Sequence, residues 1–461
     1  MELGNKPVSR RRLLQLAGVS TTLGLLSACT PAAQPAAPTA TTAAPKATAA
    51  PTTAAGAPEA TSAPTSAPAA GGRTIELTAA MPDWLQPGSS DTLKKIKASF
   101  EKSHPNVKVV EVAIPFAQFH DQMLTQFNAE SPPDVVRADE PQMPLYIEKG
   151  FVEPLDAVLK QGGLDPNSFI PAQKSTQRDG QNYGVVFISN PRAFIYNKAL
   201  YEEAGVTAPK NVAEFEEAMA KTTRADRQQF GFGLATKAGD TTGLFIQLMP
   251  VVMGMGGAFF KDGKPTATDP NNIAALKLVK SLWDKGQIPR GLDAVSTNTL
   301  IYQGKVASTV SGAFILFQAK ATDPNVAKNL DTAPSPFPAK TGMHASAYWV
   351  LPKKAKNKDL GAEYILEMLK PESQKAIVQD QGAFPARPGY VTDEYLKANP
   401  WFKVFADASS SSVSYVPLGV GAKAFDGLKI VGGAVEQVLY QNKSPENAMA
   451  DAQKELERLF T

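Results

Sequence analysis

The sequence predicts an α/β fold divided between two lobes. Strand-like and helix-like segments alternate between residues 75 and 138, which is the pattern of a doubly wound sheet. The stretch from residue 73 to residue 461 is too long for a typical single core, so two lobes are the default expectation. The sequence contains no internal repeat that would suggest a solenoid instead.

The first strand is predicted over residues 75–81, and a turn at residues 87–90 follows it. The helix after the turn places Leu93, Ile96 and Phe100 on one stripe, because these positions are three and four residues apart. These segments form the first strand and helix of the alternating pattern.

The second strand is predicted over residues 107–114. It is apolar at nearly every position except Lys108 and Glu111, which favours burial on both faces of a parallel sheet. A helix and a third strand, residues 134–138, complete the pattern. The apolar stripe of this helix consists of Phe119, Met123, Leu124 and Phe127.

Cys29 is the only cysteine of the chain and lies at the end of an apolar run. Residues 10–12 are basic, residues 13–26 are apolar and residues 27–28 are small, which is the layout of a secretory signal. The apolar segment is shorter than the about 20 residues that a membrane span needs, so we expect it to be cleaved. One thiol excludes an intramolecular disulfide, and no histidine lies near it at zinc-site spacing.

The motif LSAC, residues 26–29, resembles a bacterial lipobox, which implies that Cys29 is lipidated and becomes the mature N-terminus. The motif SRRRLL, residues 9–14, resembles a twin-arginine export signal. An ordinary signal peptide with an incidental cysteine is the alternative. Residues 30–72 are almost entirely Ala, Thr, Pro, Ser and Gly, so we expect residues 29–72 to form a lipidated, disordered tether, with a glycosylated stalk as a milder alternative.

The charge balance argues against a nucleic-acid partner. The chain has 47 Lys and Arg against 44 Asp and Glu, and residues 1–28 hold four of the former and one of the latter. Positive and negative side chains are therefore equal in number after cleavage, which gives no attraction for phosphate backbones. The sequence also has no Gly-x-Ser-x-Gly, phosphate-binding or HExxH motif.

Nine short stretches in a consistent order carry a resemblance to a known family. They are FEK (100–102), PNVKV (105–109), PPDVV (132–136), IYNK (195–198), EEAG (202–205), GKVA (304–307), SGAF (311–314), KNK (356–358) and GAFPAR (382–387). Together they resemble the family 1 extracellular solute-binding proteins of ABC importers, the carbohydrate-binding group that includes maltose-binding protein. One departure is Asn211-Val212, where the family often has Thr-Trp, but Asn211 and Glu214 can still cap the helix.

This resemblance implies the type II periplasmic-binding-protein fold, in which each lobe is a doubly wound sheet with flanking helices and the ligand lies in the cleft between lobes. Strands that cross between the lobes are expected near residues 185–190, 344–351 and 391–401. Lobe one would combine residues 73–188 with 345–390, and lobe two residues 189–344 with 391–461.

Ligands of doubly wound sheets bind beyond the carboxyl ends of the strands. Trp84 follows the first strand, where its ring could stack on a sugar or anchor its own loop. Asp139 and Glu140 follow the third strand and could accept hydrogen bonds from hydroxyls or cap a helix. Phe116, at the start of a helix, and Gln247, in a Met-bearing helix, are further candidates for which a core role is the alternative.

The family resemblance adds Asn190 as a polar group at the first crossing and Phe314 at a position where a tryptophan commonly stacks on the ligand. The alternatives are a turn residue before Pro191 for Asn190 and a core residue of lobe two for Phe314. Tyr348 and Trp349 are adjacent in the second crossing strand, so we expect only one of them to face the cleft. Arg387 could reach a ligand or pair with a surface acid.

The expected function is capture of a sugar or oligosaccharide, with a neutral carbohydrate ranked first, and its delivery to the permease subunits of an ABC importer. The protein would be exported, anchored by its N-terminal lipid to the outer face of the cell membrane and monomeric, with no cofactor, metal or catalytic residue. A glycoside-active enzyme and a binding protein for a polyamine or another small polar solute are the alternatives.

Overall fold

The computed structural model describes residues 73–339, 342–416 and 420–461. The predicted signal segment 1–28, the lipidated Cys29 and the tether 29–72 lie outside the described residues. Within the described part, no helix has both the length and the apolar character needed to cross a membrane.

The alternation predicted at the start of the body is confirmed. Strands β1, β2 and β3 are parallel and lie in the order β2-β1-β3, so the chain winds to both sides of the first strand. Helix α2 buries Leu93, Ile96 and Phe100, as the stripe predicts. The elements of this part are β1 (Ile75–Ala80), η1 (Pro82–Leu85), α2 (Ser89–Ser103), β2 (Val107–Val112), α3 (Phe116–Asn128) and β3 (Val135–Asp139).

The prediction that the second strand is buried on both faces is wrong. Strand β2 is the edge strand of its sheet, and Lys108 is exposed there, while Val107 and Val109 are buried. An edge strand has a partner on one side only, so its alternate residues meet water and tolerate charge.

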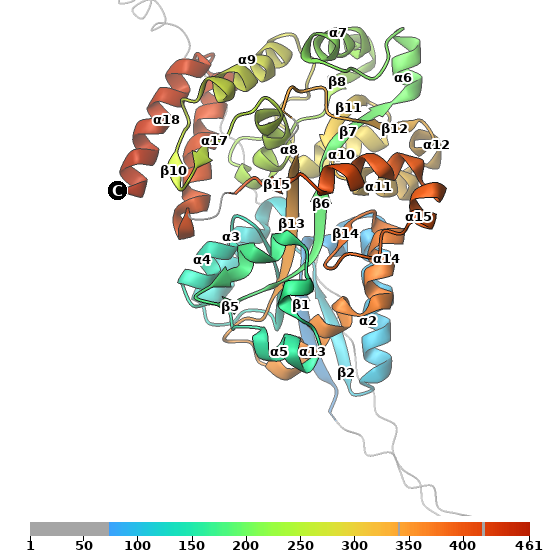
Figure 1. Ribbon diagram of the computed structural model, residues 1–461, viewed down its shortest axis with the longest axis vertical. Helices are drawn as coiled ribbons and strands as arrows, with labels where there is room; N and C mark the ends of the chain where they lie inside the picture. Colours follow the sequence, from blue (N-terminus) through green and yellow to red (C-terminus); the bar gives the residue numbers. More distant parts are fainter. Residues whose placement is uncertain (1–72, 340–341, 417–419) are drawn as a thin grey trace, which may run out of the picture. The chain divides into compact units, whose positions relative to one another are not determined.

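Further strands complete the first sheet, whose full order is β14-β6-β13-β3-β1-β2. Strand β13 is antiparallel to β3 and β6, β14 is antiparallel to β6, and β15 pairs with β13 in parallel. Strands β6 and β13 lie side by side and extend toward the second sheet (Figure 1). The added elements are α4 (Met143–Glu148), α5 (Asp156–Gln161), η2 (Pro166–Ser168), η3 (Pro171–Thr176), β4 (Gln177–Arg178), β5 (Gln181–Asn182), β6 (Val185–Pro191), β13 (Met343–Val350), α13 (Lys358–Leu369), α14 (Pro371–Gln381), β14 (Phe384–Pro385) and β15 (Val413–Ser414).

The second sheet is mixed. Its order is β12-β7-β11-β8, in which β7 is antiparallel to β11 and β12 and only β8 and β11 are parallel. Its strands are β7 (Ala193–Asn197), β8 (Phe230–Phe232), β11 (Val306–Ser311) and β12 (Leu330–Ala333), and a separate hairpin is formed by β9 (Phe260–Lys261) and β10 (Lys264–Pro265).

Helices surround the second sheet (Figure 1). The predicted cap of α7 is confirmed, because the Asn211 side chain accepts a hydrogen bond from the Glu214 amide at 3.0 Å. The helices are α6 (Lys198–Glu203), α7 (Val212–Thr222), η4 (Ala225–Arg227), α8 (Thr241–Gly254), α9 (Pro270–Asp284), α10 (Ala294–Tyr302), α11 (Phe314–Thr322), α12 (Pro324–Ala327), α15 (Asp393–Ala398), η5 (Pro400–Phe402), α16 (Lys403–Ser409), η6 (Gly421–Lys423), α17 (Ala424–Tyr440) and α18 (Pro445–Phe460).

The crossing strand predicted near residues 391–401 is not a strand. This stretch forms α15 and η5, because Thr392 caps the helix by accepting a hydrogen bond from the Tyr395 amide at 3.2 Å. Most of the intervening residues favour helix, and no neighbouring strand pairs with them.

The buried apolar side chains form separate cores. One core joins residues 77–188 to residues 347–386 around the first sheet, and we call this part lobe one. Two clusters around the second sheet join residues 193–345 to residues 402–456, and we call this part lobe two. The boundaries expected at residues 188, 344 and 390 stay predictions, and Ala345 packs in the core of lobe two.

Candidate functional site

A cavity of about 300 Å³ is lined by residues from both lobes and from the strands that connect them. On lobe one it meets η1, the start of α2 and the end of β3. On lobe two it meets α8, α10 and the junction between β11 and α11. Its volume is in the range of small-molecule sites.

The lobe-one wall holds a buried ion cluster. The guanidinium of Arg137 donates to Asp83 Oδ2 at 2.5 Å and to Asp139 Oδ1 at 2.6 Å. Burial raises the pKa of the Asp139 carboxyl, and the nearby charge of Asp83 adds to this, although Arg137 opposes it. Two acids thus share one cation, and the ring of Phe116 lies with its centroid 5.7 Å from the same guanidinium.

Amides line the lobe-two wall. Gln247 accepts a hydrogen bond from the Ala235 amide at 2.5 Å and donates one to Asn298 Oδ1 at 3.1 Å. The carbonyl of Asn298 accepts this hydrogen bond, and its amide N–H groups can donate to a ligand. No hydrogen bond within the described structure uses them.

Strands β6 and β13 run between the lobes, and we call them the hinge. The cavity wall that they form contains polar groups whose hydrogen-bonding capacity is not used within the described structure. Asn190, in β6, has a buried side-chain oxygen with no hydrogen-bond partner among the described residues. Arg192 follows β6, is 6% exposed, and donates one hydrogen bond of 3.3 Å to the hydroxyl of Ser311. Its guanidinium lies 5.7 Å from the ring centroid of Phe314. Burial lowers the pKa of Arg192 to about 10.

The structure brings together half of the ten predicted ligand contacts. Each of them lines the cavity, and together they supply two aromatic rings, one carboxylate and two amides. These residues are Phe116, Asp139, Asn190, Gln247 and Phe314.

The other five predicted contacts do not line the cavity. Trp84 is 5% exposed and its indole N–H donates to the Ala79 carbonyl at 2.9 Å, so it anchors its own loop. Arg387 donates to the Leu369 carbonyl and to the Tyr390 hydroxyl, and these partners hold it within lobe one.

Tyr348 and Trp349 are both fully buried, so the expectation that one of them faces the cleft is corrected. Their side chains point to opposite faces of β13, but helices cover both faces of the first sheet. The Trp349 ring stacks on Phe187 with the centroids 4.8 Å apart, and both residues belong to the core of lobe one.

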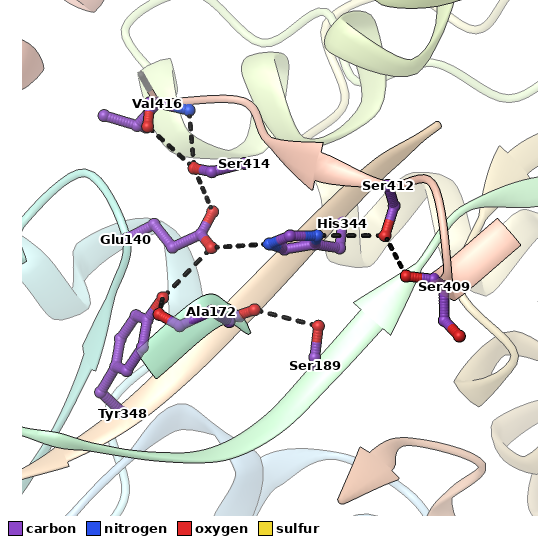
Figure 2. A network of polar contacts seen from close by, with 10 residues as sticks. Glu140, Ala172, Ser189, His344, Tyr348, Ser409, Ser412, Ser414 and Val416 are labelled. Carbon is purple, nitrogen blue, oxygen red and sulfur yellow. Dashed lines mark hydrogen bonds and ion pairs between the residues drawn. The ribbon is translucent and has the colours of Figure 1, made fainter. Parts of the chain in front are cut away.

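Glu140 lies in a polar network within the hinge, and this corrects its assignment as a ligand contact. Figure 2 shows its carboxylate between three side chains. It accepts hydrogen bonds from the hydroxyls of Tyr348 at 3.1 Å and Ser414 at 2.9 Å, and His344 Nε2 lies 3.4 Å from Oε1. Both of its carboxylate oxygens thus have partners inside the protein, and Glu140 is only 2% exposed and does not line the cavity.

Three charged residues of the cavity are not among the predicted ligand contacts: Asp83, Arg137 and Arg192. A signal for the arginines existed, because each interrupts an apolar stretch, Val135-Val136-Arg137-Ala138 and Pro191-Arg192-Ala193-Phe194. A charge inside a buried stretch needs a partner. The described residues contain no group of three or more His, Cys, Asp or Glu side chains that could hold a metal ion.

The chain resembles known proteins over most of its length. The profile described as bacterial extracellular solute-binding protein matches residues 85–375. The diacetylchitobiose binding protein DasA of Streptomyces coelicolor is 24% identical over 341 residues, which cover 71% of this chain and 77% of DasA.

Solved structures share the fold. An ABC transporter solute binding protein of Thermotoga lettingae bound with α-D-tagatose has a TM-score of 0.76 and 20% identity, covering 84% of this chain and all of its own. The GacH receptor of Streptomyces glaucescens, solved unliganded and with acarbose, has a TM-score of 0.72 and 23% identity, covering 84% of this chain and 98% of its own.

Proposed function

Because the chain belongs to the bacterial extracellular solute-binding protein family, we propose that it captures a sugar or oligosaccharide outside the cytoplasm and delivers it to the permease of an ABC importer. The observation that carries this proposal is the cavity shared by both lobes, in which Phe116 and Phe314 stand among carboxylate and amide groups. A sugar has apolar C–H faces and a rim of hydroxyls, so it needs both kinds of partner. The ligands of DasA and of the Thermotoga protein, diacetylchitobiose and tagatose, support the same class.

The lobes would open and close around the ligand by bending at the hinge. We keep the division expected from the sequence, with residues 73–188 and 345–390 in lobe one and the other described residues in lobe two, except that Ala345 packs in the core of lobe two. Since the cavity is lined from both sides, a bound ligand gains contacts only when both lobes reach it, and it therefore favours closure.

We propose binding without turnover. The two carboxylates of the cavity, Asp83 and Asp139, both hold the guanidinium of Arg137, so neither is arranged as a free acid opposite a free base. Incubation with any oligosaccharide that binds should leave it intact by mass spectrometry. Release of shorter products would contradict the proposal.

A thermal-shift screen against mono- and disaccharides, polyols, amino acids and polyamines tests the ligand class. A ligand present at about 100 times its dissociation constant should add about 2.7 kcal/mol to the free energy of unfolding. Stabilisation by polyamines or amino acids, with none by any sugar, would overturn the proposal.

The lipid anchor at Cys29 is proposed from the lipobox alone. Replacing Cys29 by Ala should release the protein from the membrane fraction of its host, because the acyl chains supply the anchoring. Membrane association as tight as that of the wild type would contradict lipidation at this residue.

A further inference from the structure

The cavity contains two buried arginines in contrasting surroundings. Arg137 is 7% exposed and holds two carboxylates at 2.5 and 2.6 Å, which raise its pKa. Arg192 is 6% exposed and has no carboxylate within ion-pair distance among the described residues, and its Nε has no hydrogen-bond partner there. A buried cation without a counter-charge is costly, so such a group is retained where something supplies the missing charge.

The groups that interact favourably with Arg192 do not supply it. Tyr415 and, to a smaller extent, Glu140 oppose the lowering of its pKa, but neither forms an ion pair or hydrogen bond with Arg192 among the described residues, and the Glu140 oxygens accept from Tyr348 and Ser414 instead. Burial still outweighs the favourable charges around Arg192, because its pKa is lowered. Glu140 does not line the cavity, whereas Arg192 and Ser311 do.

We propose that the bound sugar carries an anionic group, a carboxylate or a phosphate, that pairs with the guanidinium of Arg192. This inference rests on the proposed function, because it specifies which sugars enter the cavity. A guanidinium presents donors in a planar fork that matches two oxygens of such a group. The hydroxyl of Ser311 accepts from Arg192 and can donate its own hydrogen to the same anion.

The charges of the cavity also orient this ligand. Asp83 and Asp139 share one cation, so the wall at the end of β3 repels an anion and accepts hydrogen bonds from hydroxyls. The unpartnered oxygen of Asn190 likewise accepts from a hydroxyl. A polyol with one acidic end, that is, a sugar acid or a sugar phosphate, matches both walls.

Titration calorimetry with matched pairs tests the inference. The probes are glucose and galactose, the corresponding uronic acids, oligomers of neutral sugars and of uronic acids, and glucose 6-phosphate, in a buffer free of phosphate and carboxylate. We expect an acidic member to bind at least about 30-fold more tightly than its neutral parent. Tighter binding of the uronic acids would identify a carboxylate as the anionic group, and tighter binding of glucose 6-phosphate would identify a phosphate.

Substitution of Arg192 then tests whether this residue binds the anionic group of the ligand. Arg192→Gln should weaken binding of the preferred acid by about 100-fold and of its neutral parent by less than about threefold. Arg290→Gln is the matched control, because Arg290 contacts the Trp283 ring and lies outside the cavity, so both affinities should stay unchanged. The melting temperature of unliganded Arg192→Gln should not fall, since the substitution removes a buried charge without an acidic partner.

If Arg192→Gln does not fold, Arg192→Lys tests the same inference, because lysine keeps the positive charge but lacks the planar guanidinium that can donate to two oxygens. It should retain a reduced preference for the acid. Equal affinities for acid and neutral parent in the wild type would overturn the inference and leave the proposed function standing. Binding of no sugar, neutral or acidic, would overturn both.

Discussion

Phe314 lies at the first turn of α11 and is half-buried. Its ring lies near the guanidinium of Arg192, packs against an apolar cluster of lobe two and lines the cavity. Replacing Phe314 by Ala should weaken sugar binding by about 2 kcal/mol or more, the usual size of a dominant contact, while the fold survives. Asn190→Leu should cost about 1–3 kcal/mol, because it leaves a ligand hydroxyl without a partner.

Titration calorimetry with the sugar found in the screen measures both effects. Phe317→Ala is the control, because Phe317 lies in the same helix, packs near Trp401 and does not line the cavity. If Phe314→Ala and Asn190→Leu bind as tightly as the wild type, the ligand site lies elsewhere.

The buried side chain of His120 should make the protein less stable in acid. His120 is 8% exposed and packs edge-on against Phe425. Its Nδ1 shares one hydrogen bond of 3.3 Å with the hydroxyl of Tyr146. Burial lowers the pKa of His120 from 6.5 to about 4, with Asp121 opposing and Lys429 assisting the shift. The unfolded chain therefore binds more protons between these two pH values.

Folding therefore loses no free energy to protonation of His120 above about pH 6.5. As the pH falls toward about 4, the unfolding free energy drops by up to about 3 kcal/mol, because the unfolded chain takes up the proton first. Denaturant titrations between pH 7.5 and 4 should show a smaller drop in unfolding free energy for His120→Gln than for the wild type. Parallel curves for the two proteins would rule out His120 as the source.

At the scale of single residues, the sequence predicted positions near strand ends better than the directions in which side chains point. Asp139 and Phe116 were found because strand ends and helix starts are readable from the pattern. Arg192 was not, because its isolation from carboxylates depends on where Glu140 and Ser311 lie in space. Tyr348 and Trp349 alternate as expected, but alternation cannot reveal that both faces of a sheet are covered.

Individual elements were predicted where their signals are local. Strands β1 and β3 and helices α2 and α3 follow from apolar periodicity, and the cap of α7 follows from Asn211 and Glu214. Strand β2 was misjudged because its edge position is a property of the whole sheet. The helix α15 was missed because the crossing was placed by resemblance, whereas the Thr392 cap is a local signal.

Helix α7 packs so closely on β8 that only glycine fits at residue 231. A Cβ there would lie 2.6 Å from the Met219 carbonyl oxygen, and backbone cannot move aside as a flexible side chain can. Gly231→Ala should therefore lower the unfolding free energy by about 2–3 kcal/mol.

Gly433→Ala is the matched control in α17. Gly433 is exposed, and a Cβ there would meet nothing within 4 Å. Alanine at this position should stabilise the helix by up to about 1 kcal/mol. Chemical denaturation measures the unfolding free energies of Gly231→Ala and Gly433→Ala. Equal changes in the two variants would show that α7 and β8 are not held at this distance.

On the scale of the whole molecule, one of the contacts between lobe one and lobe two is a chain of three side chains in the cavity wall. The Tyr302 hydroxyl donates to Gln318 Oε1, and Gln318 Nε2 donates to Gln86 Oε1 at 2.9 Å. Gln86 precedes α2 in lobe one, whereas Tyr302 and Gln318 belong to lobe two. The hydrogen bond between the glutamines therefore exists only while the lobes are close together.

Replacing Gln318 by Ala should weaken the closed arrangement by about 1 kcal/mol, the usual net value of such a bond, and so lower the affinity for every ligand by about fivefold. Arg192→Gln, in contrast, should act on acidic ligands. Gln453→Ala is the control, because Gln453 accepts from the Ala267 amide and donates to the Pro265 carbonyl within lobe two. Small-angle scattering should show ligand-driven compaction of the wild type at lower ligand concentration than of Gln318→Ala. Coincident compaction curves would show that closure does not depend on this contact.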